Sequence, residues 1–157
     1  MAADAEVPHI LIVEARFYED IADELVRGAL GELQQHGATH ERVSVPGAFE
    51  IPAAIVYGLR SLQFYGGRKR FDGYIALGCV LRGETSHYDY VCGESARQLQ
   101  ELACQYALAL GYGILTCENR KQAWERASVE GRNKGADAAR ACLHMLELKR
   151  QFHLYPR

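Results

Sequence analysis

The sequence predicts an α/β fold, a three-layer α/β/α sandwich built around a four-stranded parallel sheet. Two observations lead to this prediction. Apolar runs of strand length alternate along the chain with longer segments in which apolar residues recur every three or four positions, the spacing of a helix packed on a sheet. The connections between these segments are short, which favours right-handed crossovers between parallel strands.

The first half of the chain supplies two strand and helix pairs. The apolar run HILIVEA predicts a buried strand, and the segment after it carries apolar side chains four residues apart until Gly37 ends the helix. Pro52 suits the first turn of a helix, because the N–H that proline lacks has no partner there. The expected elements are strand 9–15, helix 18–35, strand 39–45 and helix 53–62.

The second half repeats the alternation. The run FDGYIALGCVL predicts a third strand, which breaks at Gly83 before a new helix. Ser86, with Asp89 three residues later, has the form of a capping box at the start of that helix. The run YGILTC predicts a fourth strand after a glycine turn. The expected elements are strand 71–81, helix 88–109, strand 112–117, helix 119–127 and helix 135–152.

Length and charge restrict the class of protein. The 157 residues fit a single domain, which we expect over residues 9–157 behind a loose tail at residues 1–8, with a basic surface loop at residues 63–70. A net charge of −2 gives no reason to expect nucleic acid or an anionic membrane as a partner. No apolar run approaches the roughly 20 residues of a membrane span, and no secretion leader is recognisable. We therefore expect a cytoplasmic protein.

The five cysteines predict buried, reduced thiols rather than disulfides or a zinc site. They are odd in number, widely spaced and form no C-x-x-C pair. Neither they nor the six histidines show the spacing of metal ligands, so the sequence predicts no metal site. The cysteines are Cys79, Cys92, Cys104, Cys117 and Cys142.

The turn after the third strand is the clearest candidate site. Open α/β folds bind ligands outside the carboxyl ends of their strands, and the first N–H groups of a new helix can hold an anion. This turn adds a carboxylate, two hydroxyls and an imidazole, from Glu84, Thr85, Ser86 and His87. These groups predict phosphate binding combined with proton transfer.

Six motifs, each at a strand end or a helix start, together resemble the lumazine synthase family of riboflavin biosynthesis. They are Arg16-Phe17, PGAFEIP at 46–52, ALGCVLRGETxHxD at 76–89, GILT at 113–116, QAxERA at 122–127 and NKG at 133–135. Any one of them alone would be weak, but their order and spacing are specific. The resemblance covers about residues 10–148 and implies a flavodoxin-like topology.

The resemblance implies the condensation of 5-amino-6-(D-ribitylamino)uracil with 3,4-dihydroxy-2-butanone 4-phosphate to 6,7-dimethyl-8-ribityllumazine. In that reaction an imine forms, phosphate is eliminated and the ring closes with loss of water, and no metal or organic cofactor is implied. The resemblance also implies a homo-oligomer built on pentamers, with sites shared between adjacent subunits. Riboflavin synthase is a candidate partner.

For the uracil substrate, the resemblance implies that Phe17 stacks on the pyrimidine ring. The other implied pocket residues are Ala48, Phe49, Glu50, Cys79, Val80, Leu81 and, from a neighbouring subunit, Tyr112. The pattern alone leaves other interpretations open. An aromatic residue at a strand end also packs on a core, the side chains of residues 79–81 can simply be core, and Glu50 also complements a helix N-terminus.

For the phosphate, the resemblance implies contacts from Glu84 and Thr85 and a clamp by Arg126, whose planar fork donates two parallel hydrogen bonds. Lys134 would add positive potential, and Asp137 would either pair with Lys134 or orient the catalytic residue. Without the resemblance, Arg126 and Lys134 would be interpreted as solvated surface charges.

His87 matches the family's catalytic histidine, although a lone histidine after a turn is also a common structural residue. Imidazole suits proton transfer because its ordinary pKa lies near neutrality. Three positions depart from the commonest pattern without removing a chemical role. Tyr18 stands where Asn is frequent, Tyr112 where Phe is commoner and Gly93 where Asn is often seen. The loop at 66–70 is also longer than the family's shorter forms.

Two other classes of function remain open. One is a paralogue that binds lumazine or a flavin with little turnover, and the other is a shell-forming protein whose function is assembly. The joint presence of Phe17, His87 and Arg126 favours an enzyme, because a pure binder would not need all three.

Overall fold

The structure is a computed structural model that describes residues 7–61 and 70–154. At its centre is a four-stranded sheet in the order β2-β1-β3-β4, in which every neighbouring pair is parallel. The strands are β1 (His9–Ala15), β2 (Thr39–Val45), β3 (Gly73–Leu81) and β4 (Ala109–Cys117). The predicted four-stranded parallel sheet is therefore confirmed.

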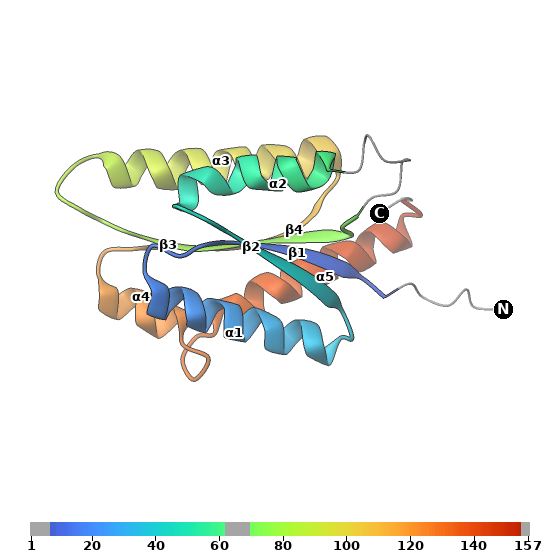
Figure 1. The fold of residues 1–157 in the computed structure, drawn as a ribbon, viewed down its shortest axis with the longest axis horizontal. Coiled ribbons are helices and arrows are strands. Elements are labelled where there is room, and N and C mark those ends of the chain that lie inside the picture. The colour runs from blue at the N-terminus through green and yellow to red at the C-terminus, as the bar shows by residue number, and fades with distance from the viewer. Residues whose placement is uncertain (1–6, 62–69, 155–157) are drawn as a thin grey trace.

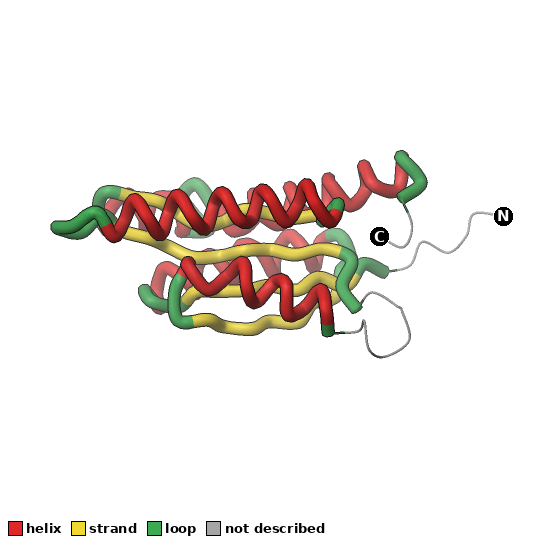
Figure 2. The backbone as a smooth tube through the Cα atoms, turned by 90° about the horizontal axis from the view of Figure 1, so that it is seen from above, coloured by secondary structure: helices red, strands yellow, loops and turns green. Residues whose placement is uncertain are grey.

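Helices cover both faces of this sheet (Figure 1). One layer contains α1 (Glu19–Gln35), α4 (Arg120–Ala127) and α5 (Lys134–Gln151), and the other contains the short 3-10 helix η1 (Ala48–Glu50), α2 (Ile51–Arg60) and α3 (His87–Tyr106). Figure 2 looks onto the second layer, with the strands running beneath α2 and α3. This is the predicted α/β/α sandwich of flavodoxin-like type.

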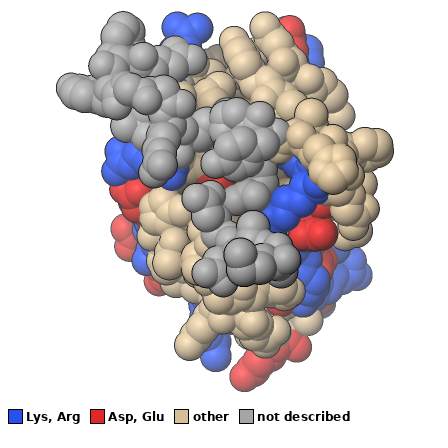
Figure 3. Space-filling model, turned by 90° about the vertical axis from the view of Figure 1, so that its right-hand side faces the viewer, with Lys and Arg blue, Asp and Glu red and all other residues tan. Residues whose placement is uncertain are grey.

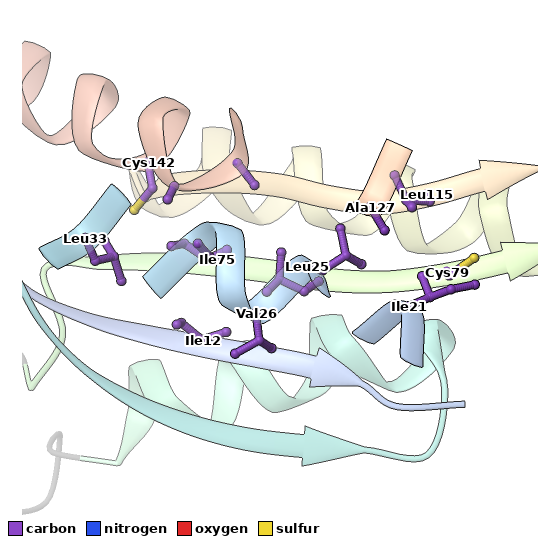
Figure 4. Close-up of a cluster of buried hydrophobic side chains, with 14 of the residues drawn as sticks. Ile12, Ile21, Leu25, Val26, Leu33, Ile75, Cys79, Leu115, Ala127 and Cys142 are labelled. Carbon is purple, nitrogen blue, oxygen red and sulfur yellow. The ribbon is translucent and has the colours of Figure 1, made fainter. Parts of the chain in front are cut away.

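Side chains that alternate along the strands divide the core into two clusters, one on each face of the sheet. Ile10 and Ile12 of β1 belong to the cluster under α1, whereas Leu11 and Val13 belong to the cluster under α2 and α3. Figure 4 shows the first cluster, in which Leu25 lies over the strands. Because both faces of β1 are covered, its sequence is a nearly continuous apolar run rather than an alternating one.

Two glycines let α5 approach its neighbours backbone to backbone. A Cβ atom at Gly135 would lie 1.9 Å from the carbonyl oxygen of Leu25 in α1, and one at Gly111 of β4 would lie 1.9 Å from the carbonyl oxygen of Ala138. Neither oxygen can move aside without displacing the helix that carries it, because the interior is close-packed. The glycine of the NKG motif therefore has a packing role.

The helix expected over residues 88–109 is wrong at its C-terminal end. α3 ends at Tyr106, Ala107 adopts the left-handed conformation with a φ of 51°, and the N–H of Leu108 donates to the carbonyl of Ala103 at 3.0 Å. Ala109 then begins β4, fully buried and opposite Gly73 of β3. The apolar residues before position 112 thus belong to the strand, where they complete the sheet.

The other four α-helices differ from the prediction by one or two residues at their ends. α2 begins at Ile51, directly after η1, so that Pro52 lies in its first turn as predicted. α4 begins at Arg120, because Asn119 is its N-cap and accepts a hydrogen bond from the N–H of Gln122 at 2.9 Å.

The predicted capping box at α3 is wrong. Ser86 is the N-cap residue, but its side chain makes no capping hydrogen bond, and its backbone is helical (φ −70°, ψ 0°) instead of extended. The N–H of His87 donates to Thr85 Oγ1 at 3.3 Å instead. Asp89 lies 3.4 Å from a guanidinium nitrogen of Arg82. The start of α3 is therefore held by residues of the preceding turn.

The end of the molecule at which the strands begin carries mixed charges, with basic and acidic side chains beside one another (Figure 3). The basic loop predicted at 63–70 lies outside the described residues except for Arg70, and the tail predicted at 1–8 does so except for Val7 and Pro8. Within the described ranges, no helix is long and apolar enough to cross a membrane.

All five cysteines are free thiols, as predicted. Cys79, Cys117 and Cys142 are buried, whereas Cys92 is half-buried and Cys104 is exposed. The expectation of burial therefore holds for the three cysteines in strands β3 and β4 and helix α5, and it is wrong for Cys104 on α3.

Candidate active site

A pocket with a volume of about 540 Å³ opens at the carboxyl ends of the strands. The predicted residues that line it are Phe17, Ala48, Phe49, Glu50, Cys79, Val80, Leu81 and His87. They come from four segments that are far apart in the sequence: the turn after β1, η1, the end of β3 and the first residue of α3. The fold thus gathers these residues in one place.

The strand order explains why the pocket forms here. From β1 the chain moves outward to β2, then crosses back to β3 on the other side of β1. The connections that leave β1 and β3 lie on opposite faces of the sheet, because α1 belongs to one layer and α3 to the other. Such a reversal of strand order opens a crevice at the carboxyl ends of the two strands, where α/β proteins bind ligands.

Two aromatic side chains give the pocket an apolar surface. Phe17 is 72% exposed and Phe49 is 58% exposed. The alternative in which Phe17 packs on the core is therefore wrong. Exposed rings of this size are suited to stacking on a flat ligand ring, which would bury them.

Tyr18 supports the ring of Phe17 from the side. The two rings meet edge to face, with centroids 4.9 Å apart and an interplanar angle of 75°. Tyr18 itself packs against the core cluster under α1, and the guanidinium of Arg120 lies 5.7 Å from its ring centroid. Arg120 is in turn paired with Asp20. The tyrosine that departs from the family pattern is thus part of the pocket wall.

Sequence reasoning missed further residues of this pocket. Tyr90 and Val91 line it because they follow His87 by about one helical turn on α3, a spacing that could have indicated them. Pro46 and Gly47 also line it, and belonged to a motif whose other members were predicted.

A buried glutamate lies beneath the turn that carries Phe17. Glu14 of β1 is only 2% exposed and accepts two hydrogen bonds from Arg42 of β2, at 2.8 and 2.9 Å. Its carboxylate also accepts one from Arg16 at 2.8 Å, and Arg16 pairs with Asp23 of α1. The signal in the sequence was a single acidic residue at the end of an apolar strand, and its role was not recognised.

Burial raises the pKa of the Glu14 carboxyl, but the hydrogen bonds from Arg42 and Arg16 outweigh burial and hold the pKa below its ordinary value. A carboxyl whose pKa is depressed on folding contributes stability above its unfolded pKa and loses that contribution as the pH falls through the folded value. The network therefore stabilises the fold at neutral pH and ceases to do so in acid.

We expect Glu14→Gln to lower the free energy of unfolding by roughly 2 kcal/mol near pH 7, because the charged acceptor of three hydrogen bonds is lost. The difference from the wild type should shrink in acid, below the ordinary pKa of about 4.3 for glutamate. Urea unfolding of the wild type and of Glu14→Gln, from pH 7 to below this pKa, measures the difference in the free energy of unfolding. A difference that stays constant with pH would show that the carboxylate charge contributes nothing.

The turn at 82–86 projects from the end of β3 and is exposed throughout. Glu84 and Thr85 lie in it, just before the first N–H groups of α3, and His87 is the first residue of that helix. The N–H of His87 donates to Thr85 Oγ1 at 3.3 Å, and that of Asp89 donates to the carbonyl of Ser86 at 3.0 Å. The positive end of the helix dipole lies at this turn, and such an end favours an anion.

Cys79 lines the pocket but is unsuited to nucleophilic chemistry. Burial, with a smaller contribution from the neighbouring Cys117, raises the pKa of its thiol to about 12. The thiolate is the nucleophilic form of cysteine, and it is not populated near neutral pH at such a pKa. Cys79 therefore serves as an apolar wall at the end of β3.

Six predicted residues do not line the pocket of their own chain. Two of them, Glu84 and Thr85, lie in the exposed turn that leads to His87, and the other four are Tyr112, Arg126, Lys134 and Asp137. Tyr112 lies on the edge strand β4 and is 45% exposed. Burial raises the pKa of its hydroxyl, and the nearby Cys92 and Tyr88 of α3 add to this. Its side chain thus faces the α3 layer from the outer edge of the sheet.

Arg126 lies on α4, and its guanidinium forms no ion pair with any described residue. One nitrogen donates to the carbonyl of Gln122 at 3.0 Å, and no described carboxylate lies within ion-pair distance. Lys134 differs, because its amino group lies 3.1 Å from Asp137, which also pairs with Arg140 at 2.7 Å. Of the two interpretations of Asp137, the structure supports the pair with Lys134.

The described residues include no group of three or more His, Cys, Asp and Glu side chains placed to hold a metal ion. Within one chain, this pocket offers an aromatic surface, the Glu50 carboxylate and the His87 imidazole.

Comparison with known proteins finds relatives that are similar to this chain over almost its whole length. A family model described as 6,7-dimethyl-8-ribityllumazine synthase matches residues 8–150, which contain every strand and the whole pocket. The 6,7-dimethyl-8-ribityllumazine synthase of Bartonella tribocorum is 51% identical over 145 residues, 92% of this chain and 92% of that protein. That of Agrobacterium fabrum is 51% identical over 144 residues, 92% of this chain and 96% of that protein.

A further relative, 6,7-dimethyl-8-ribityllumazine synthase 1 of Rhizobium meliloti, is 54% identical over 143 residues, 91% of this chain and 92% of that protein. These relatives share about half of their residues with this chain over nine-tenths of its length. The chain belongs to the 6,7-dimethyl-8-ribityllumazine synthase family.

Proposed function

We propose that this chain condenses 5-amino-6-(D-ribitylamino)uracil with 3,4-dihydroxy-2-butanone 4-phosphate to 6,7-dimethyl-8-ribityllumazine, releasing phosphate and water, as a step of riboflavin biosynthesis. The observation that carries the proposal is the pocket itself. In a chain of this family, it brings the exposed ring of Phe17 together with the carboxylate of Glu50 and the imidazole of His87, the residue at which the turn after β3 enters α3.

The pyrimidine stacks on Phe17, a contact of a kind that contributes about 0.5–1.5 kcal/mol beyond the area it buries. The Glu50 carboxylate and the backbone of Ala48 and Phe49 hold the polar groups of the ribityl chain and the ring. The backbone of residues 79–81, at the end of β3, meets the opposite edge of the pyrimidine. This arrangement presents the amino group of the uracil toward the start of α3.

His87 accepts and returns protons as the imine forms and phosphate is eliminated. The turn before it receives the phosphate, through the N–H groups and the hydroxyl of Glu84 and Thr85. Arg126 then compensates the phosphate charge that grows as the leaving group departs, and Lys134 adds positive potential that is partly offset by Asp137. Much of the acceleration comes from holding the two substrates together, because this converts an encounter in solution into a reaction within one site.

The active unit in this proposal is a homo-oligomer built on pentamers, in which Tyr112 and Arg126 of the partner subunit complete each pocket. Two features support it. Tyr112 and Arg126 do not line the pocket of their own chain, although the reaction needs a phosphate clamp. Large apolar side chains are also exposed beside the second helix layer, including Tyr57 at 73% and Val43 at 42%, and such surfaces mark protein interfaces.

We also propose the cytoplasm as the location of the reaction and riboflavin synthase as a partner protein. Both proposals rest on the family.

The proposal is tested by mixing the purified protein with both substrates and following lumazine fluorescence. We expect product to form faster than in the uncatalysed mixture, and only when both substrates are present. An intact oligomer that binds riboflavin or lumazine without accelerating the reaction would instead identify a binding paralogue.

A further inference from the structure

The turn at 82–86 has almost no packing of its own. Every residue in it is exposed, and a Cβ atom built on Gly83 would meet nothing within 4 Å. A turn of this kind would sample many conformations unless something outside it fixed its ends. Phosphate binding through backbone N–H groups needs them held in one arrangement.

Arg82 supplies that constraint by joining three segments. Its backbone N–H donates to the carbonyl of Cys117 at the end of β4, at 3.0 Å. Its Nε donates to both carboxylate oxygens of Glu118, at 3.0 and 3.2 Å. Its Nη1 lies 3.4 Å from Asp89 in the first turn of α3. The end of β3, the end of β4 and the start of α3 are thus connected through one side chain.

The plane of the guanidinium is fixed as well. It lies over the ring of Tyr88, with 4.3 Å between the guanidinium carbon and the ring centroid. Tyr88 is itself held between α3 and the sheet, where its hydroxyl interacts with Thr116 of β4. A lysine at position 82 could form one ion pair but could not stack and bridge two carboxylates at once.

Ion pairs with Glu118 and Asp89 of the same chain compensate the charge on Arg82. Arg126 is different, because it has no carboxylate partner among the described residues. An arginine that already faces two carboxylates is poorly placed to bind a phosphate, since the anion would have to displace them. Arg82 is therefore suited to holding the turn and Arg126 to meeting the anion.

We propose that Arg82 is a positioning residue for the phosphate-bearing substrate, which fixes the turn that presents Glu84 and Thr85 without touching the phosphate. The inference rests on the proposed function, and it adds a residue to which the family resemblance gave no role. Glu118, which directly follows β4, holds Arg82 through an ion pair and is the second residue of this arrangement.

The test measures KM for each substrate in Arg82→Gln, Arg82→Lys and Glu118→Gln. We expect KM for the butanone phosphate to rise about tenfold or more in Arg82→Gln, because a displacement of about 1 Å in a positioning group can cost up to about a hundredfold. KM for the ribitylaminouracil should stay within about twofold, since Phe17 and Glu50 lie on other segments. Arg27→Gln, on α1 with a single ion pair to Glu24, is the matched control.

Glu118→Gln separates positioning from direct contact. If Arg82 positions the turn, Glu118→Gln removes its anchor and raises KM for the butanone phosphate. The variant that carries both Arg82→Gln and Glu118→Gln then has the same KM as Arg82→Gln alone. If Arg82 binds the phosphate itself, removing the competing carboxylate leaves this KM unchanged or lowers it, which would overturn the inference. A parallel rise in both KM values with a fall in the melting temperature would also overturn it, because it would indicate a general loss of structure.

Calorimetric titration with inorganic phosphate supplies a measurement that needs no turnover. We expect the wild type to bind phosphate and Arg82→Gln to bind it about tenfold more weakly or worse. Equal affinity, or no binding by either protein, overturns the role of Arg82. A wild type that binds phosphate but catalyses nothing would overturn the proposed function instead, and the comparison of affinities would still decide on Arg82.

Discussion

Replacing His87 with alanine is expected to slow lumazine formation by about 10²–10⁴-fold, the usual contribution of a general acid–base residue. The imidazole lines the pocket at the first residue of α3, where it is exposed. Catalysis should not fall to the uncatalysed rate, because Phe17, Glu50 and the phosphate turn still hold both substrates together.

The measurement is kcat and both KM values for His87→Ala and His87→Gln across the neutral pH range. We expect kcat to fall with little change in either KM, since proton transfer matters in the transition state and less in binding. His144→Ala, an exposed histidine on α5, is the control and should behave as the wild type. A His87→Ala protein with unchanged kcat would show that the proton shuttle is another group.

Replacing Arg126 with alanine is expected to lower kcat/KM by about 10²–10³-fold, since losing one partner of a desolvated charge pair costs about 2–5 kcal/mol. The reason is that its charge has no carboxylate partner among the described residues and is available for the phosphate. Arg126→Lys should recover only part of the loss, because lysine keeps the charge without the planar fork. Lys121→Ala, on the exposed side of the same helix, is the control.

Mixing the two inactive variants tests whether sites are shared between subunits. Within one chain, Arg126 does not line the pocket that contains His87. In randomly mixed oligomers of His87→Ala and Arg126→Ala chains, roughly a quarter of the sites would combine an intact His87 with an intact Arg126 of the partner subunit. Activity well above that of either variant is expected. Mixtures as inactive as their components would place both residues in the site of a single chain.

The sequence alone determined the sheet and the position of the pocket. The bounds of β1 and β2 were predicted correctly from local signals. Pro8 precedes β1 and its apolar run stops at Arg16, whereas β2 lies between Gly37 and the Pro46-Gly47 turn. The family resemblance predicted the eight pocket residues, and the pocket lies at the edge of the sheet where the carboxyl ends of parallel strands meet. The family resemblance, carried by the same motifs, supplied the expected chemistry.

Other features depended on contacts between distant segments. The end of α3 was misjudged because the residues around Ala109 are compatible with a helix, and only their pairing with β3 makes them a strand. The capping box at Ser86 failed because Asp89 lies beside Arg82, a partner that local spacing does not indicate.

Contacts between distant segments also determine how the site is built. Glu14 meets Arg42 only because β1 and β2 are neighbours, and Arg82 meets Glu118 only because β3 and β4 are. The separation of Tyr112 and Arg126 from their own pocket follows from the place of β4 at the edge of the sheet. Local sequence therefore determined which chemical groups stand at each strand end. The tertiary structure decided which of them meet, because hydrogen bonds and ion pairs depend on distances that the order of the strands sets.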